Sequence, residues 1–126
     1  MTTVSDLEKR GKYLAHRFSM PEPKVSYKIV ETKFDESNMP MLGEFYFLTS
    51  ELEISEDVVN ADEMVLDFVL WHELSHYYDG VNFSPYDSIS DRHGPTFDSI
   101  NDRLDKKWMR AFKTKRLMRK LKCRLN

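Results

Sequence analysis

Residues 62–80, DEMVLDFVLWHELSHYYDG, contain the pattern on which the predicted fold depends. The run is apolar on nearly all sides of a helical projection, so we expect a helix from Asp62 to Asp79 in the interior of the domain. Asn60 and Glu63 resemble a capping box at its start, and Gly80 is a natural stop at its end. The sequence therefore predicts one buried helix around which the other elements pack.

This helix carries two histidines four residues apart, His72 and His76, with Glu73 directly after the first. Residues i and i+4 lie on one face of a helix, so both imidazoles can bind one cation. Glu73 is rotated by about 100°, which lets its carboxylate reach a metal-bound water without being a ligand. The pattern is HExxH, two zinc ligands and a general base. The alternative, a buried polar cluster without metal, is costly in so apolar a helix.

A catalytic zinc needs a third protein ligand and one open position. The sequence offers His93, just before a last helix that should open at Gly94-Pro95, with proline in its favoured first position. Aspartates compete for this role, and one of them, or Asp98, could instead accept the second ring N–H of a ligand histidine. The competing ligands are Asp79, Asp87 and Asp91.

The rest of the chain predicts an α+β domain. An N-terminal helix, a small sheet and a long C-terminal helix should surround the helix of the HExxH motif. The connections between strands are short, so an antiparallel sheet is the economical arrangement. The predicted ranges are a helix over Val4–Phe18, strands over Lys24–Phe34, Leu42–Leu48 and Glu51–Ile54, and a final helix from Pro95 whose leucines recur as far as Leu125.

Composition narrows the class of protein. The chain has 126 residues, of which 40% are hydrophobic and 32% charged, which suits one globular domain. It shows no apolar run long enough for a membrane-spanning helix and no secretory signal, so we expect no membrane partner. Cys123 is the only cysteine, which excludes an internal disulfide and a cysteine-based zinc ribbon. These features favour a cytoplasmic location.

The net charge of −2 conceals a strong asymmetry. Residues 103–126 contain 11 Lys or Arg and one acid, Asp105, whereas the preceding 102 residues contain 8 basic and 20 acidic side chains. We therefore predict a core domain over residues 1–112 and a basic helical tail over 113–126. The tail is either a solvated helical face or a sequence-independent contact to DNA phosphates. If the tail contacts DNA, we also expect the protein to associate with the nucleoid.

The pair of motifs HELSH (72–76) and HGPTF (93–97) resembles the SprT-like, or Spartan-type, metalloproteases. The stretch LGEFYFLTSELEIS (42–55) is similar to the strand pair that precedes the metal helix in that family. The resemblance implies a zincin-like fold and a zinc-dependent endopeptidase that acts on DNA-associated proteins. It also implies that His72, His76 and His93 bind Zn²⁺ and that Glu73 is the catalytic acid and base. The chain departs from many members because it lacks a four-cysteine ribbon.

The leading hypothesis is thus a zinc-dependent endopeptidase of protein substrates, DNA-associated proteins among them. A rival is a non-catalytic, zinc-stabilised module that binds nucleic acid or protein. A third reading is a narrow-specificity peptidase that ignores DNA, for which the basic tail is irrelevant. Tyr77 and Tyr78 follow the motif, either as an oxyanion donor or, more commonly, as core or pocket wall. Oligomeric state and target protein are left open.

Overall fold

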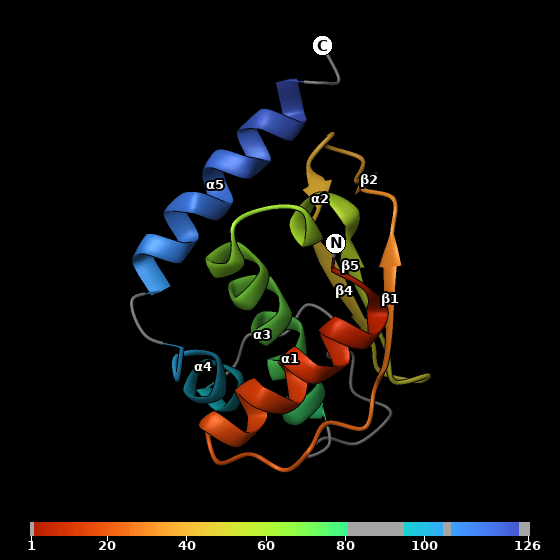
Figure 1. The fold of residues 1–126 in the computed structure, drawn as a ribbon. Coiled ribbons are helices and arrows are strands. Elements are labelled where there is room, and N and C mark those ends of the chain that lie inside the picture. Colours follow the sequence, from red (N-terminus) through yellow and green to blue (C-terminus); the bar gives the residue numbers. More distant parts are fainter. Residues whose placement is uncertain (1, 81–94, 105–106, 124–126) are drawn as a thin grey trace.

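The structure is a computed structural model that describes residues 2–80, 95–104 and 107–123. Within these ranges the fold is α+β, as predicted, with five helices and two small sheets (Figure 1). The helices are α1 (Val4–Arg17), α2 (Glu56–Val59), α3 (Glu63–Gly80), α4 (Pro95–Asn101) and α5 (Lys107–Cys123). The strands are β1 (Ser26–Val30), β2 (Lys33–Phe34), β3 (Pro40–Met41), β4 (Gly43–Tyr46) and β5 (Glu51–Ser55).

Helix α3 is the centre of the domain. Of its 18 residues, 13 are buried, and it contacts α1, α2, α4 and α5 as well as strands β4 and β5. Figure 1 shows it between α1, the sheet and the C-terminal helices. Trp71, Leu70 and Leu74 are fully buried. The helix that the sequence predicts to lie in the interior is therefore at the core of the protein. The predicted bounds of this helix agree with the structure to within one residue at each end.

The start of α3 differs from the prediction. Asn60 does not cap this helix, because it closes the short helix α2 and donates its backbone N–H to the carbonyl of Glu56. Asp62 takes the capping position instead, and its Oδ1 accepts from the backbone N–H of Met64 at 2.7 Å. A side-chain acceptor at this position satisfies a backbone donor that has no partner within the helix.

The prediction of an antiparallel sheet is wrong, because the main sheet is mixed. Its order is β1-β5-β4, with β5 antiparallel to β4 but parallel to β1. Strand β5 takes the middle place because its side chains are the most buried of the sheet, with Leu52, Ile54 and Ser55 at 1% exposure or less. The parallel pairing needs a long crossover, which residues 31–50 provide. That crossover includes β4 and the separate antiparallel pair β2–β3.

The prediction of one long C-terminal helix is also wrong. Helix α4 ends at Asn101 and α5 starts at Lys107. The carbonyl of Ile100 accepts from the indole N–H of Trp71 at 2.9 Å and from the backbone N–H of Arg103 at 3.2 Å. It therefore does not accept from Leu104 as an α-helix would require, and Leu104 turns into the core, 4% exposed.

Helix α5 packs on α3 and β3 and carries the predicted basic run. Leu121 is 1% exposed and Leu117 packs against the core, while Lys115, Arg119, Lys120 and Lys122 are exposed. The helix runs across the predicted boundary at residue 112, and that division into two parts stays a prediction. None of the helices in the described ranges is both long and apolar enough to cross a bilayer.

Candidate metal centre

The two motif histidines lie side by side on one face of α3, as the spacing predicts. The ring centroids of His72 and His76 are 5.1 Å apart, with an interplanar angle of 77°. A tetrahedral zinc that binds two imidazole nitrogens at about 2.1 Å places the ring centroids about 5 Å apart. The observed separation therefore fits a shared zinc ion without rearrangement of α3. His76 is 8% exposed, and His72 is partly exposed toward a hollow in the surface.

Glu73 lies beside this pair in an apolar environment. Its side chain is buried, with 7% of the residue exposed. Burial raises the pKa of Glu73 to about 8, and the negative charge of nearby Glu44 adds to the rise. A carboxyl group at this position can take up a proton and return it, as a general base and acid does.

Phe97 connects the second motif to the first. Its ring centroid is 5.1 Å from that of His72 and 4.5 Å from that of His76, and only 2% of the residue is exposed. The hydrogen bond from Trp71 to the carbonyl of Ile100 fastens α4 to α3. The last residue of the HGPTF motif, Phe97, therefore packs against the two histidines of the HExxH motif. An apolar side chain against ligand histidines limits solvent access to a metal site.

The proposed third ligand, His93, lies outside the described residues, as do Asp87 and Asp91. Among the residues that the structure describes, no group of three His, Cys, Asp or Glu is arranged to hold a metal. Asp79 is 2% exposed on α3, and Asp98 is exposed on α4. The proposed site residues therefore stay predictions: His72, His76, His93 and Glu73. The structure brings together His72, His76 and Glu73.

The two tyrosines after the motif point away from it, toward the chain before β1. The hydroxyl of Tyr77 accepts from the backbone N–H of Lys24 at 3.2 Å, and the hydroxyl of Tyr78 donates to the carbonyl of Pro21. Tyr78 is also 4% exposed. Both phenols hold the N-terminal region on α3, which gives them a structural role rather than an oxyanion contact.

A hollow of about 230 Å³ opens beside Glu73. Strands β3 and β4 form one side through Pro40 and Gly43, with Leu42 between them, and α3 forms another. The third side comes from α5, through Thr114 and Met118. This wall could not be predicted from the sequence, because helical periodicity shows which face of α5 is apolar but not what that face covers. Gly43 did carry a signal, since a glycine inside a strand often marks a close approach.

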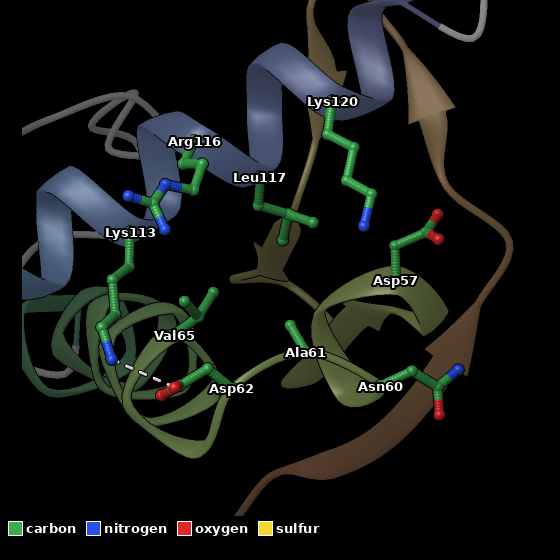
Figure 2. A pocket seen from close by; sticks show the side chains of 9 residues that line it. All are labelled: Asp57, Asn60, Ala61, Asp62, Val65, Lys113, Arg116, Leu117 and Lys120. Carbon is green, nitrogen blue, oxygen red and sulfur yellow. Dashed lines mark hydrogen bonds and ion pairs between the residues drawn. The ribbon is translucent and has the colours of Figure 1, made fainter.

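A larger hollow of about 420 Å³ lies on the other side of α5 and contains no residue of either motif (Figure 2). Lys113, Arg116 and Lys120 of α5 face Asp57 and Asp62 across it. Lys113 is paired with Asp62 at 3.0 Å. Although it is larger, this hollow is not the candidate site, because His72 and Glu73 line the hollow of about 230 Å³ instead.

Comparison with solved structures supports the fold. The chain is similar to the zymogen of the metallopeptidase abylysin of Pyrococcus abyssi, with a TM-score of 0.66 at 18% identity, covering 94% of this chain and 95% of that one. It is also similar to the zymogen of the metallopeptidase jannalysin of Methanocaldococcus jannaschii, with a TM-score of 0.62 at 20% identity, covering 96% and 99%. No protein-family model and no curated protein sequence matches the chain. At these identities, the finding is that the chain has the fold of two archaeal metallopeptidase zymogens.

Proposed function

We propose that the chain is a zinc-dependent endopeptidase of protein substrates, of the SprT-like type, with His72, His76 and His93 as ligands and Glu73 as the base. The observation that carries the proposal is the pair of imidazoles 5.1 Å apart beside a buried glutamate, at an open hollow. The similarity in fold to two metallopeptidase zymogens supports it. When bound, zinc would lower the pKa of a water and polarise the substrate carbonyl.

The residues of the chain supply the proton transfer and the position of the substrate. Glu73 takes the proton of the attacking water and returns it to the leaving amine. The outer edge of β4 pairs with no other described strand and lies next to the hollow. An extended peptide can add to such an edge by main-chain hydrogen bonds, which would bring a peptide carbonyl to Glu73.

The test is a comparison of wild type with Glu73→Gln. The variant should retain zinc and lose cleavage of casein or histone, because the amide cannot take up a proton. A chelator should abolish the wild-type activity, and His93→Ala should lower the zinc content of the purified protein. Equal cleavage by Glu73→Gln would refute the proposal. Zinc binding without metal-dependent cleavage under any condition would favour the non-catalytic binding module.

We further propose that the exposed basic side chains of α5 contact DNA phosphates, which would bring DNA-associated proteins to the site. Lys115, Arg119, Lys120 and Lys122 are exposed on this helix, and no acid occurs in residues 107–123. Phosphate contacts release counterions, so affinity for DNA of any sequence should fall steeply as salt rises. Lys115→Glu with Lys122→Glu should weaken binding and flatten that dependence. Binding that is insensitive to salt would leave the peptidase proposal intact and remove DNA from it.

A further inference from the structure

Helix α5 supplies a wall of the hollow at Glu73 that neither motif contains. Thr114 and Met118 line the hollow together with His72 and Glu73. These two residues are one helical turn apart, so they point the same way. Thr114 is 7% exposed and Met118 is partly exposed. Helix α5 therefore turns one side toward the candidate active site, while Lys115, Arg119, Lys120 and Lys122 are exposed.

This wall is held by contacts outside the hollow. Leu121 is 1% exposed, and Leu117 packs against the core of the domain. On the far side, the ammonium of Lys113 is 3.0 Å from the carboxylate of Asp62 at the start of α3 (Figure 2). The surface pair adds little energy, so the apolar anchors determine where Met118 lies.

The chemistry of the lining selects an apolar occupant. Pro40, Leu42, Phe68 and Val69 surround the hollow. Among the described residues that line it, Glu73 is the one acidic side chain and none is Lys or Arg. Burying a substrate charge there without a partner would be costly. The volume of about 230 Å³ is below the roughly 300–1,000 Å³ of small-molecule sites, and it matches one large side chain of a bound peptide.

We propose that this hollow holds an apolar side chain, of the size of leucine or methionine, from a substrate residue next to the scissile bond, and that Met118 sets the largest side chain admitted. The inference rests on the proposed peptidase function. A scissile carbonyl at Glu73 brings the neighbouring residue to the hollow, because consecutive Cα atoms are about 3.8 Å apart. The unbranched side chain of Met118 can adjust to different occupants.

The experiment uses fluorogenic peptides in which each residue flanking the cleaved bond is varied in turn among Ala, Leu, Met, Phe, Asp and Lys. Wild type should cleave the Leu and Met peptides at least tenfold faster, by kcat/KM, than the Asp peptide. Met118→Ala should raise the ratio of Phe to Leu cleavage about tenfold, and Met118→Trp should shift the preference to Ala. Cys123→Ala, at an exposed position near the end of the same helix, should leave every ratio unchanged.

A second measurement separates this inference from the peptidase function. Glu73→Gln, alone and combined with each Met118 variant, is titrated against the same peptides by fluorescence anisotropy. The affinity order should follow the cleavage order and shift with Met118. Cleavage by wild type with ratios that are the same in both Met118 variants would overturn the inference and leave the peptidase standing. If no peptide is cleaved, peptide affinities that do not change with Met118 would overturn it, and affinities that shift with Met118 would support it.

Discussion

Replacing Gly43 by alanine places a methyl group between β4 and α3, directly against the proposed base. A Cβ atom at this position would lie 3.0 Å from Val69 Cγ1, 3.1 Å from Glu73 Cγ and 3.2 Å from the carbonyl oxygen of Glu53. Ordinary contacts of this kind begin at 3.4 Å. The strand must therefore move away from α3, or the Glu73 side chain must shift by about 0.3 Å.

That displacement has a calculable effect on catalysis. A misplacement of about 1 Å can lower a rate by about 10²-fold, so a shift of about 0.3 Å corresponds to a loss of roughly fourfold in kcat. The overpacked interface should also cost about 1–3 kcal/mol of stability. Zinc content should not change, because the methyl group touches Glu73 and not the two histidine rings.

The assay measures kcat, zinc content and the free energy of unfolding in parallel. Gly11→Ala is the matched control, because its Cβ would lie 2.2 Å from the Tyr27 hydroxyl, in the core beside α1. This control should lose stability at unchanged kcat per folded molecule. Gly43→Ala with the wild-type kcat, at full zinc content, would refute the argument that the missing side chain at Gly43 positions Glu73.

Three further outcomes follow from contacts in the core and site. Asp67→Asn should lower the free energy of unfolding by about 1–3 kcal/mol in urea denaturation. The substitution removes the carboxylate of Asp67 on α3, which accepts two hydrogen bonds from the guanidinium of Arg10 on α1, at 2.7 and 2.6 Å. Trp71→Phe should cost about 1–2 kcal/mol and loosen α4, seen as faster amide exchange there, because the carbonyl of Ile100 loses its indole donor. In metal-free protein, stability should fall as pH rises from about 4.5 to about 8, because burial raises the pKa of Glu73 and the folded state alone holds the proton in that window. Glu73→Gln should remove that part of the pH dependence, and an unchanged slope would contradict the assignment.

The element that the sequence predicts best is the one whose pattern is longest. An apolar run around HExxH can only be a buried helix, and α3 lies within one residue of the predicted bounds. The sequence does not distinguish its cap, because Asn60 and Asp62 are both good capping residues and the four-residue helix α2 is too short to show a period. Local patterns thus locate an element more reliably than its first residue.

The strand order of the sheet and the break between α4 and α5 depend on contacts between distant residues, which no local sequence pattern encodes. Alternation identifies the faces of β5, but its parallel pairing with β1 depends on which strand has the most buried side chains. The break after Asn101 depends on an indole from α3 that takes the carbonyl of Ile100. The histidine pair could be predicted from spacing alone, whereas the place of Met118 beside it could not.

The position of Met118 has a consequence for synthesis of the protein. Ribosomes make chains from the N-terminus, so the segment with the HExxH motif emerges well before α5. Until α5 docks on α3, the side of the hollow formed by Thr114 and Met118 is missing. Under the proposed function, a growing chain would therefore hold the HExxH residues before the surface that receives a substrate side chain is complete.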